Sequence, residues 1–117
     1  MADVDYLHAV AAAASQQQGN ILECGSGLST IVLAAVAKDG QVWTLEHSRE
    51  WLEKLQGTLR RHGLAGRVHL RHAPLKSYGE FSWYELPVDL PSSFSLVVCD
   101  GPPARSAPPA GATACCR

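Results

Sequence analysis

Two glutamates and a glycine turn are the residues of this sequence whose types and spacing best suit ligand chemistry. Glu23 precedes the turn Gly25-Ser26-Gly27, and Glu46 follows Glu23 by about 20 positions at the end of the next apolar run. Glycines at a turn let the backbone bend tightly and let a ligand approach it closely. In a nucleotide-binding turn, a carboxylate about 20 residues further on holds a ribose through its hydroxyls. The spacing therefore predicts a site for a ligand that contains a ribose.

The position of Glu23 separates two classes of such ligands. A dinucleotide would bring its pyrophosphate to the glycine turn, where like charges at about 4 Å repel by roughly 4 kcal/mol at an effective dielectric near 20. S-adenosylmethionine has no phosphate, and its sulfonium and ammonium groups attract a carboxylate. Thr30 also stands where the dinucleotide fingerprint has its third glycine. These residues favour S-adenosylmethionine over a nicotinamide dinucleotide.

The pattern Glu23-x-Gly25-x-Gly27-x-Ser29 resembles motif I of the class I S-adenosylmethionine-dependent methyltransferases. The resemblance covers roughly residues 1–105, the N-terminal half of such an enzyme. It implies that the backbone of the glycine turn holds the methionine and ribose parts of the cofactor, that Glu23 faces its amino group, and that Glu46 accepts both ribose hydroxyls. It also implies that His47 lies beside the adenine. The residues expected to bind the cofactor are Glu23, Gly25, Ser26, Gly27, Ser29, Glu46, His47 and Ala73.

Asp100 is the candidate catalytic residue. Asp100-Gly101-Pro102-Pro103 looks like the motif that follows the fourth strand in this family and borders the methyl-transfer site. The resemblance implies that Asp100 orients the nucleophile, acts as a base, or helps to hold a metal as in catechol-type enzymes; capping of the following turn is the alternative. Such metal sites need further carboxylates or amides from a fifth strand, which this sequence lacks, so we expect no metal.

Hydrophobic periodicity predicts the elements that position these residues. Helices are expected over about 3–16, from a cap at Ser29 and Thr30 to about 38–40, and from a cap at Ser48 to Gly63, with Trp51 in the buried stripe of the third helix. Strands are expected over about 21–24, 41–46, 67–72 and 94–100. Together they predict an α/β fold with a doubly wound, mainly parallel Rossmann-like sheet in the order 3-2-1-4, truncated before the fifth to seventh strands. The carboxyl ends of these strands bring the candidate residues to one crevice.

Two further segments carry separate expectations. Residues 73–93 contain three prolines and no convincing helix, and Phe81–Leu86 is predicted to form a short extra strand. Its aromatic residues either line a substrate entrance or pack against the sheet. Residues 106–117, rich in alanine, proline and glycine, are predicted to lack fixed structure and to follow a single domain over 1–105.

Composition excludes several partners. A formal net charge of −1 gives no reason to expect a nucleic acid, and the alanine run at 11–14 is too short to cross a membrane. Four cysteines without metal-ligand spacing, and an acidic N-terminus without the basic region of a signal peptide, favour a reducing, cytoplasmic setting. The last predicted strand is apolar and has no lysine, so we expect self-association through its exposed edge.

The sequence thus predicts the cofactor-binding half of an S-adenosylmethionine-dependent methyltransferase that acts on an unidentified small molecule. Two alternatives remain open: a non-catalytic S-adenosylmethionine-binding module or truncated fragment, and an NAD-dependent oxidoreductase. Whether so short a chain is active is also open, because most substrate-positioning residues of the family come from the half that would follow.

Overall fold

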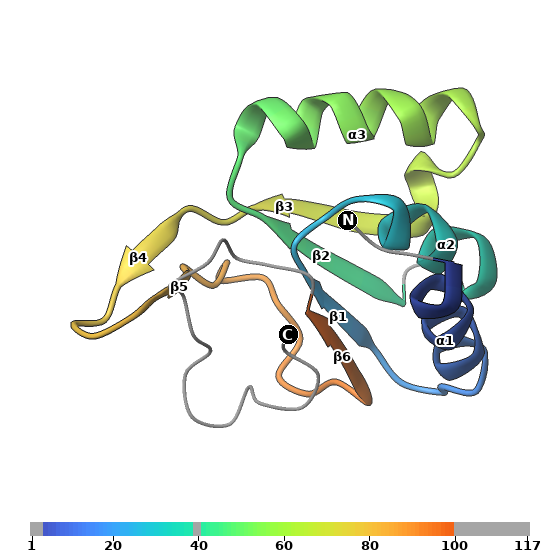
Figure 1. Cartoon of the computed structure of the whole chain (residues 1–117), viewed down its shortest axis with the longest axis horizontal. Helices are drawn as coiled ribbons and strands as arrows, with labels where there is room; N and C mark the ends of the chain where they lie inside the picture. The colour runs from blue at the N-terminus through green and yellow to red at the C-terminus, as the bar shows by residue number, and fades with distance from the viewer. Residues whose placement is uncertain (1–3, 39–40, 100–117) are drawn as a thin grey trace.

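Four parallel strands form the central sheet of the computed structural model, which describes residues 4–38 and 41–99 (Figure 1). The strands are β1 (Ile21–Cys24), β2 (Val42–Glu46), β3 (Val68–His72) and β6 (Leu96–Cys99), and they lie in the order β3-β2-β1-β6. The predicted order 3-2-1-4 is confirmed, with β6 as the fourth predicted strand. Within the described residues β6 pairs only with β1, so it forms one edge of this sheet.

Three helices cover one face of the sheet. They are α1 (Val4–Ser15), α2 (Leu28–Val36) and α3 (Arg49–Arg61), and a 3-10 turn, η1 (Ala65–Arg67), leads from α3 into β3. Alternate residues of each strand point toward these helices, as the period of two in a strand requires. The resulting core includes Val10, Ala14, Ile21, Leu33, Ala34, Val42, Leu55, Leu59, Val68 and Val98.

The N-terminus of α2 differs from the prediction. Gly27 is the residue that caps the helix, and Ser29 and Thr30 lie inside its first turn. Thr30 Oγ1 accepts a hydrogen bond from the backbone N–H of Gly27 at 3.1 Å. The expected cap at Ser29 and Thr30 is therefore wrong by two to three positions, because both hydroxyls turn inward to Glu23.

The ends of α3 follow the prediction, but one of its side chains does not. Ser48 caps the helix by accepting a hydrogen bond from the N–H of Trp51 at 3.1 Å, and Gly63 follows the helix with a φ of 71°. Trp51 was expected in the buried stripe with Leu52, yet its side chain is 45% exposed. It is held at the surface because its indole N–H donates to the Ser26 carbonyl at 3.2 Å.

The opposite face of the sheet carries a hairpin and a loop. Strands β4 (Leu75–Ser77) and β5 (Ser82–Tyr84) pair antiparallel, and the hairpin extends away from the sheet on the side opposite α1 and α2 (Figure 1). The predicted extra strand is confirmed as β5; its partner β4 was not predicted. A second core on this face joins Cys24, Leu45, Ala73, Trp83, Tyr84 and Cys99.

A hollow of about 490 Å³ on this second face lies between strands β1 and β6 and the loop before β6. Leu22 and Val97 form its floor, and Leu86, Leu90 and Phe94 are among its walls. The loop therefore covers this part of the sheet only incompletely. No helix in the described part of the chain is long and apolar enough to cross a bilayer.

Candidate functional site

The carboxylate of Glu46 and the glycine turn meet at the carboxyl ends of β1 and β2. Oε1 of Glu46 accepts hydrogen bonds from the N–H of Ser26 at 3.0 Å and from its hydroxyl at 2.5 Å. Oε2 accepts from the N–H of Ser48 at 2.9 Å, at the start of α3. The side chain is 4% exposed. Glu46 thus ties the turn after β1 to the helix after β2, and three of the about four lone-pair positions of its carboxylate are used.

Two further hydrogen bonds hold the turn. The N–H of Gly25 donates to the Leu45 carbonyl at 2.9 Å, and the Ser26 carbonyl accepts from Trp51. Gly25 has a φ of 91°, which a residue with a side chain adopts only at a cost. Gly27 is different: its backbone is extended, and a Cβ built there would meet no protein atom within 4 Å. Packing within the protein does not require a glycine at Gly27, and its bare backbone borders open space.

Glu23 lies beneath the turn, on the side of α2. Its side chain is fully buried; Oε1 accepts from Thr30 Oγ1 at 2.6 Å and from Thr44 Oγ1 at 2.9 Å, and Oε2 accepts from the hydroxyl of Ser29. Ser29 is likewise fully buried. Hydroxyl donors compensate for the cost of burying this carboxylate. Both side chains were expected to contact the cofactor; in this structure they contact each other and brace the turn from below.

Two histidines continue the site along the ends of β2 and β3. His47 is about one third exposed, and its carbonyl oxygen accepts a hydrogen bond from Nε2 of His72 at 3.1 Å. Because a carbonyl can only accept, His72 carries its proton on Nε2, and its Nδ1 then accepts from Arg49 Nη2 at 3.1 Å. Ala73, expected to bind the cofactor, is fully buried in the second core, and its N–H donates to the Glu46 carbonyl at 2.8 Å.

The structure therefore brings most of the predicted site together. Gly25, Ser26, Gly27, Glu46 and His47 lie together at the carboxyl ends of β1 and β2. The candidate catalytic residue Asp100 and the predicted tail 106–117 lie outside the described residues. Among residues 4–38 and 41–99, no cluster of three or more histidine, cysteine, aspartate or glutamate side chains could hold a metal ion.

Two residues at this end of the sheet were not found from the sequence. Trp51 matches the apolar period of α3, which predicts a core residue. That period does not distinguish a side chain buried in the core from one that stays at the surface and contacts Ser26. Tyr84 lies in the predicted strand 81–86, whose aromatic residues were expected either to line a substrate entrance or to pack against the sheet; its place beside the glycine turn was not predicted. It is fully buried beside Cys24 and Cys99, at the ends of β1 and β6. The aromatic run at 81–84 was the one signal that pointed to this segment.

Comparison with known proteins finds the same fold among solved structures. A methyltransferase from Geobacter sulfurreducens superposes with a TM-score of 0.53 at 20% identity, over 63% of this chain and 41% of that protein. The YcgJ protein from Bacillus subtilis gives 0.56 at 14% identity, over 80% and 36%. A methyltransferase-like protein from Silicibacter pomeroyi gives 0.51 at 22% identity, over 69% and 42%. No protein-family model and no curated protein sequence matches the chain.

These likenesses concern architecture, since all three identities are below 25%. The aligned part spans only about two fifths of each solved protein. In this chain the matching fold is a parallel Rossmann-like sheet. The chain has a class I methyltransferase-like fold over part of its length.

Proposed function

We propose that this chain binds S-adenosylmethionine at the carboxyl ends of β1 and β2 and forms the cofactor-binding part of a methyltransferase that acts on a small molecule. When bound, this cofactor supplies an electrophilic methyl group on its sulfonium. The protein's part in such a transfer is to hold donor and acceptor in line, so positioning dominates.

The observation that carries the proposal is the contact between Glu46 and Ser26. A carboxylate at the end of the second strand accepts donors from the glycine turn at 2.5 and 3.0 Å. Adjacent hydroxyls of a ribose are donors of the same kind as the Ser26 hydroxyl. A ribose placed over the turn could therefore take the place of the Ser26 hydroxyl on Oε1 and use the remaining lone pair on Oε2.

The residues around the turn also fit the charge and shape of the cofactor. Two carboxylates, Glu23 and Glu46, lie at the ends of adjacent strands, which suits a ligand with a sulfonium and an ammonium group rather than a pyrophosphate. Open space above Gly27 lets a ligand contact the bare backbone. In this assignment Gly25, Ser26, Gly27, Glu46 and His47 contact the cofactor, and Glu23 and Ser29 support the turn.

The alternatives differ in what they bind and do. An NAD-dependent oxidoreductase would bind NADH at the same crevice. A non-catalytic module would bind S-adenosylmethionine without transferring its methyl group. Either binding function would use the described residues around the glycine turn, whereas transfer also depends on residues that position the acceptor.

Isothermal titration calorimetry of the whole chain with S-adenosylmethionine, S-adenosylhomocysteine and NADH tests the proposal. We expect both sulfur-containing ligands to bind with one site per chain and NADH to give no heat above dilution. Binding of NADH alone would overturn the proposal in favour of the oxidoreductase. Binding without release of S-adenosylhomocysteine in the presence of pooled small-molecule acceptors would favour the non-catalytic module.

We also propose that a second copy of the chain pairs with the β6 edge. Strand β6 is apolar and carries no lysine, and Leu96 and Val97 are only partly buried. Uncharged apolar strands of this kind favour the addition of another strand.

A further inference from the structure

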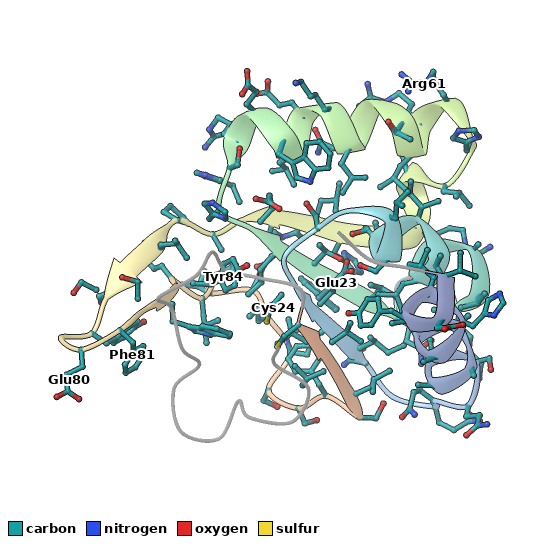
Figure 2. The ribbon with its side chains drawn as sticks, viewed as in Figure 1. Glu23, Cys24, Arg61, Glu80, Phe81 and Tyr84 are labelled. Carbon is teal, nitrogen blue, oxygen red and sulfur yellow. The ribbon has the colours of Figure 1, made fainter. Side chains whose placement is uncertain are left out.

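Tyr84 is the last residue of β5 and is fully buried at the carboxyl ends of β1 and β6. Its ring packs with Cys24 and Cys99 in the second core and lies edge-on to Trp83, with 5.3 Å between ring centroids. On its other side, the ring of His47 lies 6.4 Å away. Figure 2 shows Tyr84 close to Cys24, where the hairpin returns to the sheet. Tyr84 thus joins the second face of the sheet to the proposed cofactor crevice.

The hydroxyl of Tyr84 has no hydrogen-bond partner among the described residues, although it is shielded from solvent. A phenylalanine would fill almost the same volume without leaving a buried donor unsatisfied. Buried polar groups in proteins are nearly always paired, so an exception at a site suggests a partner outside the described residues, such as a ligand. Burial, followed by the nearby Cys24 and Glu46, raises the pKa of Tyr84 well above its usual value. The hydroxyl therefore stays protonated and can donate.

His47 lies between Tyr84 and Glu46 in this network of contacts. Its Nδ1 is buried, forms no hydrogen bond, and lies within ion-pair distance, 3.3 Å, of Oε2 of Glu46. The His47 ring also contacts Tyr84. The Tyr84 hydroxyl is thus the one of these groups without a partner in the described residues, and it belongs to a side chain that lies beside His47 and near the carboxylate proposed to hold the ribose.

We infer that the Tyr84 hydroxyl donates a hydrogen bond to the nucleoside part of the ligand that binds beside Glu46 and His47. The acceptor is a ribose oxygen or an adenine ring nitrogen, since these are the acceptors that a nucleoside presents near its ribose hydroxyls. The inference rests on the proposed function, because it takes the ligand to be S-adenosylmethionine or its demethylated product. Tyr84 then adds a contact from the β4–β5 hairpin, whereas the other proposed contacts come from residues that follow or end β1 and β2.

The substitution Tyr84→Phe tests this inference. Tyr78→Phe is the matched control, because Tyr78 lies on the same hairpin and is 46% exposed. Calorimetry of the whole chain with S-adenosylhomocysteine and with adenosine gives two affinities for each variant. We expect Tyr84→Phe to weaken both by the same factor, about fivefold, and Tyr78→Phe to change neither. Without ligand, Tyr84→Phe should melt at the same temperature as the wild type or higher, because no protein hydrogen bond is lost.

The other possible results of this experiment would overturn either the inference on Tyr84 or the proposed function. Unchanged affinities in Tyr84→Phe overturn the inference, and so does a loss for S-adenosylhomocysteine without a loss for adenosine, which would place the contact on the amino-acid part. A lower melting temperature with unchanged affinities assigns Tyr84 a purely structural role. If the wild type binds neither S-adenosylhomocysteine nor adenosine, the proposed function itself fails, and this result is distinct from the other three.

Discussion

Replacement of Glu46 by glutamine tests the site and the fold together. The carboxylate accepts from two backbone N–H groups, one on each oxygen: Ser26 on Oε1 and Ser48 on Oε2. Glutamine has almost the same shape but only one oxygen. Its amide nitrogen would therefore face one of the two N–H groups, and that donor would lose its acceptor. Glu46 is only 4% exposed, so water does not readily replace the lost acceptor.

The size of the effect follows from these contacts. Loss of one hydrogen bond to a charged acceptor costs about 1.5–3 kcal/mol. For a domain of this size, each kcal/mol lowers the melting temperature by about 4–8 °C, so Glu46→Gln should lower it by about 6–24 °C. The same change removes the charged acceptor for the ribose hydroxyls and should weaken the binding of S-adenosylmethionine by at least about tenfold, which corresponds to about 1.4 kcal/mol. An effect on binding alone, with the fold untouched, is not expected from this geometry.

Urea unfolding and calorimetry measure the two effects separately. The affinity is measured at a temperature at which urea titration shows both proteins to be folded, so that partial unfolding does not lower the apparent affinity. Glu50→Gln is the control, because Glu50 is an exposed glutamate in the first turn of α3, close in sequence to Glu46. We expect this control to change stability by a few tenths of a kcal/mol and affinity not at all.

Two results would refute the reasoning. If Glu46→Gln melts like the wild type, the hydrogen bonds from Ser26 and Ser48 do not hold the turn. If it binds S-adenosylmethionine as tightly as the wild type, Glu46 is not the ribose acceptor, and the central argument for the proposed function is lost.

Three further predictions concern other parts of the molecule. Ser26→Ala should strengthen S-adenosylmethionine binding severalfold in calorimetry, because the ribose no longer displaces the Ser26 hydroxyl from Glu46; weaker binding would instead make that hydroxyl a direct ligand contact. Burial raises the pKa of Tyr84, so above about pH 10 this residue keeps its proton in the folded state and loses it in the unfolded state. The free energy of unfolding should therefore fall as the pH rises, by up to about 1.4 kcal/mol per pH unit more steeply in the wild type than in Tyr84→Phe. Parallel pH profiles from urea titrations of the two proteins would contradict this. Sedimentation over a concentration series should show self-association of the wild type. Val97→Lys on strand β6 should raise the concentration at which the chain self-associates. A wild type that stays monomeric at every concentration would exclude pairing at β6.

The helices and parallel strands could be predicted because their patterns are local. Leu52, Leu55 and Leu59 recur at the helical period and are buried on α3, and Ser48 caps that helix as expected. The apolar run of β6 and the polar–apolar alternation of β3 gave their correct order in the sheet. In each case the pattern can be read from residues that are only a few positions apart in the sequence.

The contacts of the site could not be predicted to the same degree, because they join distant residues. Nothing near Trp51 in the sequence indicates that its indole donates to Ser26, 25 positions away. The hydroxyls of Ser29 and Thr30 point inward because they donate hydrogen bonds to Glu23. A capping preference considers only residues near the helix start and does not include this partner. Strand β4 has only three residues and no apolar alternation, so it forms only because β5 lies beside it.

The burial of Glu23 against the first turn of α2 has a consequence for the electrostatics of the helix. The N-terminus of a helix carries a partial positive charge that usually attracts phosphate or sulfate. Here Glu23 accepts from hydroxyls of the second and third residues of α2, so its negative charge offsets that partial charge from inside the protein. Free phosphate and sulfate should therefore bind poorly at this turn. Replacement of Glu23 by a neutral residue would be the first step in converting this turn from a site for cationic ligands into one for anions.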